Sequence, residues 1–489
     1  MRTDKLPYGE LYPKCRKEID ESAKRESIQR KLRRWLVDYL GFNFKKYKKG
    51  VYVDSHERPD VKAHRKQLLN RIYGDIFPYM PSYGRDGDEK DDAMSPTNHT
   101  HELPSKPLSE LPYIIHVVVQ DETSLESNDI PRSGWVHTVT GLGQLCPKKG
   151  RGQGVTVSAF ACEAMGFLFL EKLKFGKNQE GFWDADDHYR HSEKAVTAFD
   201  NYFTEKGEVP GRNKGCFLFD QSTLHAKYAS DALRAVCMVL KDGGKNQPYM
   251  RDTTYINRDG VVTFQEMSFV DVATGNKVTK GLVRVLQERG IVVRRSGAKY
   301  TVILPDNSER DVPGKCDVCK VVSGLYRDST DTKYCCLTRT MHLQPDFLNQ
   351  KPAVMEMIES RVYICLMLPK FHCELNYIEM IWATLKSKVR SKNVSVTKSS
   401  CSFDEMLTNL DQAIAELREN VSLFRKCARN TYRMMSIYHE GGDNIDASCA
   451  PWIARKFHAH RRVSRKQIED TCAKWRKEKG LDDNVCGDL

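Results

Sequence analysis

The sequence predicts an α/β protein in which a mixed sheet is flanked by helices on both faces. Apolar runs of strand length recur along the chain, helical patterns alternate with them in the later part, and no internal repeat is visible. Of the 489 residues, 40% are hydrophobic and 29% are charged, which is typical of a globular protein of about three domains. This composition excludes a disordered or collagen-like chain.

Two helices are expected before the first strand of the sheet. Residues 28–42 and residues 60–73 each repeat apolar side chains at helical spacing, and each pattern stops at a glycine. The stretch that follows, residues 81–107, is rich in Pro, Ser, Asp and Asn and poor in apolar residues. We therefore interpret residues 81–107 as a linker.

The main domain is expected to begin with a strand at residues 113–120, a nearly continuous apolar run that ends at Asp121. A later apolar run, residues 215–219, also ends in an aspartate, Asp220. Between these runs, the pattern predicts strands at residues 134–139, 154–161 and 166–170 and a helix at residues 186–202.

The second half of the chain contains a region that fits the alternation of strands and helices poorly. We interpret this region, residues 241–351, as an insertion into the main domain. From about Ser402 the chain is helical by pattern and increasingly basic. Within and after the insertion, the pattern predicts helices at residues 280–289, 356–361 and 375–389 and a buried strand at residues 362–368.

The charge balance favours polyanionic partners. Lysine and arginine number 77 and aspartate and glutamate 65, so the net charge is +12, which is compatible with binding to nucleic acid. No apolar run is long and uncharged enough for a transmembrane helix, and no secretory signal is recognised, so we expect a protein of the cell interior without a membrane partner. The 16 cysteines are then expected as reduced thiols, with metal binding a candidate role where their spacing is tight.

Three carboxylates are candidates for one metal site. Asp121 and Asp220 directly follow apolar strands, and Glu379 lies on the helix after a third strand, so a sheet could bring all three to one end. Carboxylate oxygens suit Mg²⁺ or Mn²⁺, and a pair of such ions can promote displacement at phosphorus. The alternative is ordinary structure, because aspartates often begin turns and helices carry surface glutamates. Glu374, about 140° from Glu379 around a helix axis, is not expected to share the site.

Local sequence around these acids resembles a known family. Residues 120–124 (QDETS), 219–225 (FDQSTLH) and 369–382 (PKFHCELNYIEMIW) resemble, in order, the three signature blocks of mariner-like DDE transposases. Residues 49–61 (KGVYVDSHERPDV) and 460–463 (HRRV) are similar to segments of the fungal transposon proteins of this type. The resemblance extends over roughly residues 28 to 465.

The resemblance implies an RNase H-like catalytic domain whose triad is Asp121, Asp220 and Glu379. Two divalent ions, Mg²⁺ or Mn²⁺, would be bound by these three acids and would serve the cleavage of transposon ends and strand transfer into target DNA. In the third block, Glu374 and Tyr377 depart from the Asp and Pro of the family pattern. The implied partner is double-stranded DNA, the implied location is the nucleus, and a homo-oligomer on DNA is expected.

His225 matches a family position near the second aspartate, and we expect at most a supporting role for it because a lone histidine is usually a packing residue. With the resemblance, the fold class becomes an RNase H-like domain with a large insertion and helical N- and C-terminal parts. The chain is then divided into residues 1–45, a remnant of a helix-turn-helix DNA-binding region; 46–110, a helical segment and linker; 111–240, the first part of the catalytic domain; 241–351, the insertion; 352–395, the last strand and helix of the catalytic domain; and 396–489, the basic helical C-terminal region.

The insertion contains a cysteine pattern with the spacing of a zinc knuckle. Cys316 and Cys319 form a C-x-x-C pair, Cys335 and Cys336 follow after fifteen residues, and His342 lies close behind. Because adjacent cysteines do not easily bind one metal together, His342 could replace one of them. Structural Zn²⁺ and buried or exposed thiols without metal both remain open.

Clusters of basic residues are candidates for contacts with DNA phosphates. Residues 33–42 look like the end of a helix-turn-helix region, but only about 27 residues precede the helix, too few for a full paired array. An alternative function is therefore an inactive or domesticated transposase-derived protein that binds DNA without cutting it. The candidate DNA-binding residues are Arg30, Lys31, Arg33, Arg34, Lys45, Lys46, Lys148, Lys149 and Arg151, and a solvated helix face is the competing interpretation for the first four.

Overall fold

The computed structural model divides by its contacts into two compact units. The first consists of Met1–Trp183, Lys194–Asp220 and Leu366–Leu489, and the second of Asp184–Glu193 and Gln221–Cys365. The six finer domain ranges expected from the sequence stay predictions. No helix within the described ranges combines the length and apolar composition needed to cross a membrane. The residues that the structure describes are 25–38, 40, 42–46, 56–83, 87, 89–93, 106–131, 133–137, 150–175, 183–316, 334–394, 401–442, 445, 449–457 and 463–479.

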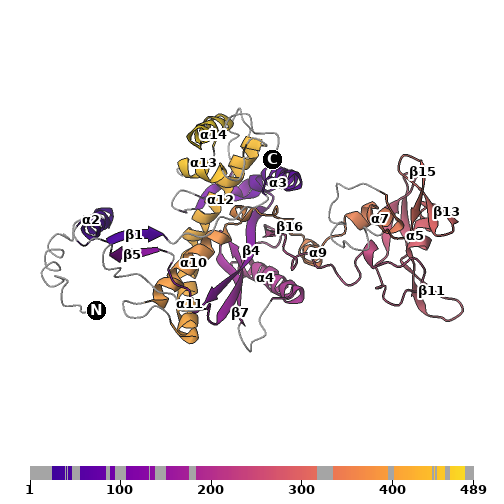
Figure 1. The fold of residues 1–489 in the computed structure, drawn as a ribbon, viewed down its shortest axis with the longest axis horizontal. Helices are drawn as coiled ribbons and strands as arrows, with labels where there is room; N and C mark the ends of the chain where they lie inside the picture. Colours follow the sequence, from indigo (N-terminus) through magenta and orange to yellow (C-terminus); the bar gives the residue numbers. More distant parts are fainter. Residues whose placement is uncertain are drawn as a thin grey trace. The chain divides into compact units, whose positions relative to one another are not determined.

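A five-stranded mixed sheet forms the centre of the first unit (Figure 1). Strand β4 pairs with β8 in parallel and with β6 antiparallel, and β6 pairs antiparallel with β7. This confirms the α/β class with a mixed sheet. In spatial order the strands are β16 (Ile364–Met367), β8 (Asn213–Phe219), β4 (Ile114–Glu126), β6 (Gly154–Cys162) and β7 (Gly166–Phe175).

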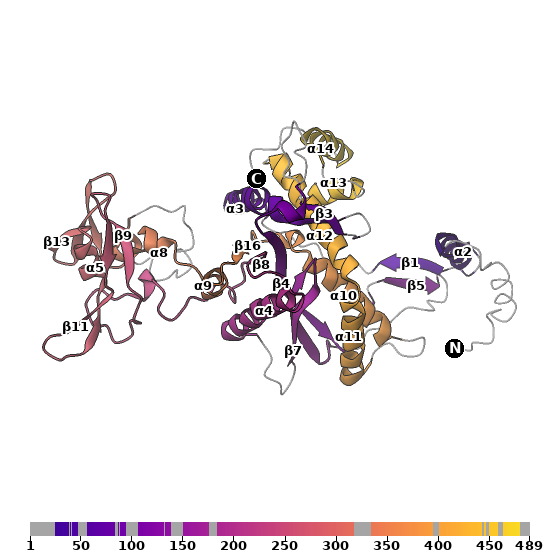
Figure 2. The ribbon, with the colours of Figure 1, turned by 180° about the vertical axis from the view of Figure 1, so that it is seen from behind.

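Alternate residues of β4 contact helices on opposite faces of the sheet, which explains why its apolar run is almost continuous. The His116 ring lies 4.9 Å from the ring of Phe203 in α4 (Ala185–Glu205). On the other face, the Asp121 side chain accepts a hydrogen bond from Trp382 of α10 (Ile378–Asn393). Figures 1 and 2 show α4 on one side of β4 and α10 on the other.

The C-terminal part is helical, as the sequence predicts. Ser402 begins the first of these helices with a capping box, in which its hydroxyl accepts from the Glu405 backbone and the Glu405 carboxylate accepts from the Ser402 backbone. Phe424 packs edge-on against Phe167 of β7, with ring centroids 5.0 Å apart. The helices are α11 (Phe403–Arg418), α12 (Val421–Gly441), α13 (Ala450–Lys456) and α14 (Arg465–Lys479).

Three expectations for the N-terminal half need correction. The first part of the expected linker pairs as a hairpin of β2 (Pro81–Tyr83) and β3 (Glu89–Ala93), held where Arg425 lies over the buried Tyr83 ring. The strand expected at residues 134–139 is β5 (Ser133–His137), which pairs with β1 (Phe42–Lys46) instead of joining the main sheet. The helix expected at residues 28–42 is α2 (Arg25–Asp38), which ends earlier because β1 begins at Phe42.

The other N-terminal helix, α3 (Pro59–Arg71), matches the expectation and continues as a π-helical turn, η2 (Ile72–Ile76). It begins with proline at its first position, where the missing N–H group costs nothing. Val61, Leu68 and Leu69 are its buried apolar side chains.

The second unit is built from short antiparallel pairs around its own apolar core. Helix α5 (Leu282–Glu288) contributes Leu282, Val285 and Leu286 to this core, and α7 (Leu337–His342) contributes Leu337 and Met341. The pairs are β9 (Thr253–Ile256) with β10 (Val262–Gln265), β11 (Ser268–Val270) with β12 (Lys277–Thr279), and a three-stranded sheet of β13 (Val292–Ser296), β14 (Lys299–Ile303) and β15 (Glu309–Pro313); two further helices are α8 (Pro345–Leu348) and α9 (Ala353–Ser360).

Candidate active site

Asp121 and Asp220 lie on neighbouring strands at the point where their parallel pairing ends. Val119 of β4 is opposite Leu218 of β8, and continuing this register by two residues places Asp121 beside Asp220. Asp220 directly follows β8, as expected. Asp121 does not follow its strand: β4 continues to Glu126 because β6 still pairs with it, with Asp121 opposite Ala159. The sheet thus brings the two aspartates together at an edge that β8 leaves open.

Glu379 reaches the same region from the first turn of α10, where a carboxylate is favoured by the helix dipole. Asn376 anchors this helix end to the sheet: its Nδ2 donates to the Gln120 carbonyl at 3.0 Å, and its Oδ1 accepts from the Ile378 backbone at 3.4 Å. The Tyr377 hydroxyl lies 3.0 Å from the Val117 carbonyl and 2.9 Å from that of Ala161. Backbone atoms of β4 and β6 therefore determine where Glu379 stands.

The three carboxylates lie close enough to act on one another electrostatically, although their oxygens do not all lie within 4.8 Å of one another. Burial and the carboxylates of Glu379, Glu122 and Asp220 together raise the pKa of Asp121 well above its usual range. Burial also raises the pKa of Glu379; Lys386, two turns further along α10, lowers it, and Asp220 raises it again. Like charges at one place disfavour ionisation, and a bound cation would relieve that repulsion.

Trp382 orients the first aspartate from α10. Its indole Nε1 donates to the Asp121 carboxylate at 3.1 Å, while its ring stacks on Phe167 at a centroid distance of 5.8 Å. The side chain is only 2% exposed. Asp121 therefore has one oxygen held by a rigid donor.

Glu374 belongs to a separate hydrogen-bonded network. Its Oε1 lies 2.7 Å from His372 Nδ1 and accepts from the Tyr438 hydroxyl at 2.9 Å, and its Oε2 is 3.7 Å from His56 Nε2. Burial alone would raise the pKa of Glu374, but the hydrogen bond with His372 and the nearby His56 ring lower it to about 2. Arg65 Nη1 lies 3.3 Å from His372 Nε2; because a guanidinium only donates, the Nδ1 proton of His372 points to Glu374. Both ring nitrogens of His372 thus have partners, and we assign a structural role to His56, His372 and Glu374.

His225 is a buried residue of the second unit, 2% exposed, with its ring centroid 4.1 Å from that of His188. Both rings line a cavity of about 340 Å³ together with Tyr189, Lys227 and Tyr228. The supporting role expected for His225 stays a prediction.

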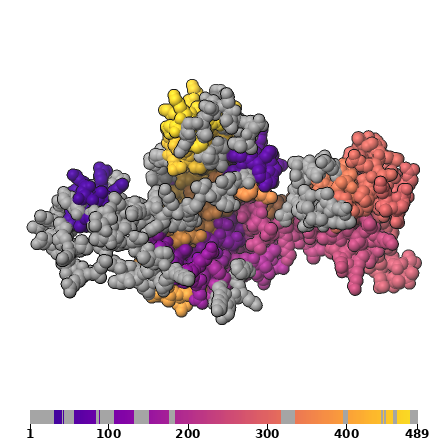
Figure 3. All heavy atoms as spheres, viewed as in Figure 1, coloured from indigo at the N-terminus to yellow at the C-terminus, as the bar shows by residue number. Residues whose placement is uncertain are grey.

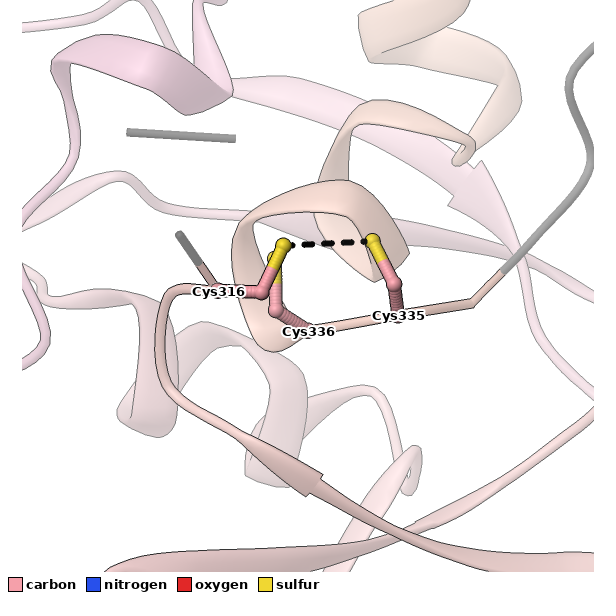
Figure 4. A group of neighbouring side chains, drawn as sticks. All are labelled: Cys316, Cys335 and Cys336. Atoms are coloured by element: carbon pink, nitrogen blue, oxygen red, sulfur yellow. Dashed lines mark hydrogen bonds between the residues drawn. The ribbon is translucent and has the colours of Figure 1, made fainter. Parts of the chain in front are cut away.

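Three of the predicted zinc ligands converge. The Sγ atoms of Cys316, Cys335 and Cys336 all lie within 4.8 Å of one another (Figure 4). Cys316 follows β15, and the other two precede α7. Cys319 lies outside the described residues, and His342, which is described, is not in the group.

The predicted DNA-binding residues are described only in part. On α2, Arg30, Lys31, Arg33 and Arg34 are exposed, and Figure 3 shows the side chains of this helix on the surface. Arg151 is also exposed, with its Nη1 3.5 Å from the Glu126 carboxylate. Lys45 and Lys46 lie in β1 with side chains outside the described part, and Lys148 and Lys149 lie outside it altogether.

Sequence reasoning missed three residues of the site. Glu122, the next residue of β4, acts on the pKa of Asp121 through its charge, but its side chain belongs to the opposite face of the strand, where it accepts from Gln120 Nε2 at 2.6 Å. Asn376, Tyr377 and Trp382 all stand in the third signature block, so their position there was an available signal; the apolar pattern alone assigned Trp382 to packing.

Of the comparisons with known proteins, the one with solved structures gives matches. Neither a protein-family model nor a curated protein matches the sequence. Among solved structures, a pre-cleavage Mos1 transpososome is 14% identical, covering 42% of this chain and 46% of that one, with a TM-score of 0.23. A Mos1 mariner paired-end complex with Mn is 14% identical over 46% of this chain and 55% of that one, also at 0.23. The chain spans about half the length of these proteins, so the function proposed below is based on its own residues.

Proposed function

We propose that this chain is a mariner-like DDE-type DNA transposase with an RNase H-like catalytic domain. The observation that carries the proposal is the strand register that places Asp121 beside Asp220, with Glu379 at the start of α10 close enough to raise the pKa of Asp121. The mixed sheet flanked by helices is the architecture that the family resemblance implies. The substrate is double-stranded DNA, cut at transposon ends and joined to a target in the nucleus by an oligomer of the chain.

The donor set of the site fits two Mg²⁺ or Mn²⁺ ions, because it consists of carboxylate oxygens at an open sheet edge. When bound, such ions supply activation of water or a DNA 3′-hydroxyl and stabilise the leaving oxygen. The chain's own residues position the donors. Trp382 orients Asp121, Asn376 and Tyr377 hold the helix that carries Glu379, and the end of β8 places Asp220 at the exposed edge.

The proposal is tested by nicking of supercoiled plasmid DNA with Mg²⁺ or Mn²⁺. The parent chain should cut, and Asp220→Asn should cut at least about 100-fold more slowly, equivalent to roughly 3 kcal/mol of transition-state stabilisation. Asp411→Asn is the matched control, because Asp411 is an exposed acid of α11 paired with Lys172. Equal cutting by the parent and Asp220→Asn, while Asp411→Asn also cuts, would refute the assignment.

The exposed basic face of α2 favours a second candidate function, a transposase-derived protein that binds DNA without cutting it. This candidate predicts that the parent never nicks DNA. It also predicts that replacing all three acids leaves the salt dependence of DNA binding unchanged. Metal-dependent nicking by the parent would remove this candidate.

A further inference from the structure

Two segments of the second unit place three thiols at one point. Cys316 follows β15, and Cys335 and Cys336 immediately precede α7, with residues 317–333 between them in the sequence. Figure 4 shows the sulfur of Cys316 facing that of Cys335, with Cys336 beside them. The two segments are also joined by their backbones, because Thr338 N donates to the Gly314 carbonyl at 3.3 Å.

The spacing of the sulfurs matches a shared metal better than a disulfide. The Cys316 and Cys335 Sγ atoms are 3.6 Å apart. A disulfide requires about 2.05 Å. Two thiolates on one tetrahedral zinc, each about 2.3 Å from the metal, stand about 3.8 Å apart. The observed separation is therefore close to the edge of a zinc tetrahedron.

We propose that Cys316, Cys335 and Cys336 bind a structural zinc ion. Three thiolates form a soft donor set, which selects zinc over the hard cations expected at the carboxylate site. Cys336 is fully buried and Cys335 is exposed, so the site combines a fixed ligand with an opening through which metal can enter. A fourth ligand, other than these three side chains, completes the tetrahedron.

Zinc at this place would clamp two elements that share the core of the second unit. Val312 of β15 and Leu337 and Met341 of α7 are buried in the same cluster. Cys336 packs against Val236 and Cys316 in a small cluster of its own, where apolar contacts are few. A metal that binds only the folded arrangement adds its binding free energy to folding. This gain would compensate for the few apolar contacts of the small cluster around Cys336.

The test measures metal content and does not depend on DNA cleavage. The full chain is purified with a thiol reductant, supplied with Zn²⁺, desalted and analysed for zinc by elemental mass spectrometry. The parent should retain about one zinc ion per chain. Cys335→Ser and Cys316→Ser should each lose most of it. Cys237→Ser is the matched control, because Cys237 is a partly buried thiol of the same unit outside the group, and it should retain the parental amount.

Replacing zinc by Co²⁺ gives a second readout on the unaltered chain. Tetrahedral cobalt bound by thiolates should show intense visible bands and sulfur-to-cobalt charge transfer, so the result stands even if Cys316→Ser does not fold. No retained zinc in the reduced parent would overturn the proposal. Parental zinc in Cys335→Ser, or loss from Cys237→Ser equal to that from Cys335→Ser, would overturn it as well.

Discussion

Trp382 shows that one side chain can serve the core and the site together. Its ring is buried against Phe167, and its only polar atom is directed at the Asp121 carboxylate. A leucine would fill the same apolar position without that donor. The indole thus couples the packing of α10 to the orientation of an acid on β4.

Replacing Trp382 by phenylalanine separates the two roles. Trp382→Phe keeps an aromatic ring against Phe167 but removes the hydrogen bond to Asp121. We expect plasmid nicking to slow by about tenfold and the free energy of unfolding to fall by about 1 kcal/mol. Nicking rates and urea unfolding of both proteins measure the two effects; unchanged nicking would show that the indole donor does not matter to the reaction.

Glu163 is a buried acid outside the site, hydrogen bonded by the Tyr432 hydroxyl at 2.8 Å. Burial raises the pKa of Glu163 to about 7 from an ordinary value of 4.5. Between these pH values the folded chain keeps a proton that the unfolded chain releases. Stability should therefore fall as pH rises through this window.

Glu163→Gln removes this pH dependence. Above pH 8 the variant should be more stable than the parent, by roughly 3 kcal/mol from the pKa difference, whereas near pH 4 the two should be similar. Urea unfolding across the pH range measures this, with the exposed Glu208→Gln as control. Parallel stability curves for the parent and Glu163→Gln would contradict the protonated state of Glu163.

Among the elements, α5 and α8 of the second unit are joined by a buried ion pair. Arg289 Nη1 and Nη2 donate to the two carboxylate oxygens of Asp346 at 2.9 and 2.8 Å, with side chains 0% and 7% exposed. The guanidinium also lies over the rings of Tyr255 and Phe347. Such a pair is costly to break because one charge remains buried.

Asp346→Ala should lower the free energy of unfolding by about 3–5 kcal/mol, since Arg289 would stay buried without its counter-ion. The exposed pair of Arg294 and Glu309, 3.6 Å apart in the same unit, provides the contrast. Glu309→Ala should leave stability nearly unchanged. Urea unfolding measures the loss of unfolding free energy in both variants. Equal losses would show that breaking the buried Arg289 pair costs no more than breaking an exposed pair.

The elements differ in how far the sequence predicts them. Apolar runs and helical spacing correctly predict β6, β8, α4 and α10, because the buried residues of each element form a recognisable apolar pattern in its own sequence. The polar end of β4 reads as a turn, since its pairing depends on β6 rather than on local propensity. The pairing of β5 with β1 escaped prediction for the same reason: partners distant in the sequence leave no local trace.

The candidate site also has a part that the sequence predicts and a part that it does not. Asp121, Asp220 and Glu379 were selected by their place after strands and within signature blocks, and the sheet register brings the two aspartates side by side. The anchoring contacts of Asn376 and Tyr377 were not foreseen. They are made to backbone carbonyls of β4 and β6, and such acceptors carry no sequence signal.

At the scale of the whole molecule, the excess of positive charge should govern affinity for DNA. Each phosphate contact by a basic side chain adds about 0.9 to the slope of log affinity against log salt. Removing the four charges of α2 should therefore weaken binding and lower that slope by up to about 3.6. Binding to a duplex measured by fluorescence anisotropy from low to moderate salt gives the slope.

The matched control removes four lysines that already contact carboxylates. An equal change of slope in both variants would show that only net charge matters and that α2 is no DNA-binding face. The α2 variant replaces Arg30, Lys31, Arg33 and Arg34 by alanine, and the control replaces Lys172, Lys194, Lys388 and Lys392.

The hydrogen bond from Asn376 to Gln120 spans 256 positions of the chain. During synthesis, β4 and β8 leave the ribosome first, and all of Gln221–Cys365 must follow before α10 exists to meet them. Contacts of such long range form slowly and late. The nascent protein therefore carries only two of the three proposed acids while Gln221–Cys365 is synthesised, and a copy terminated within that stretch never acquires Glu379.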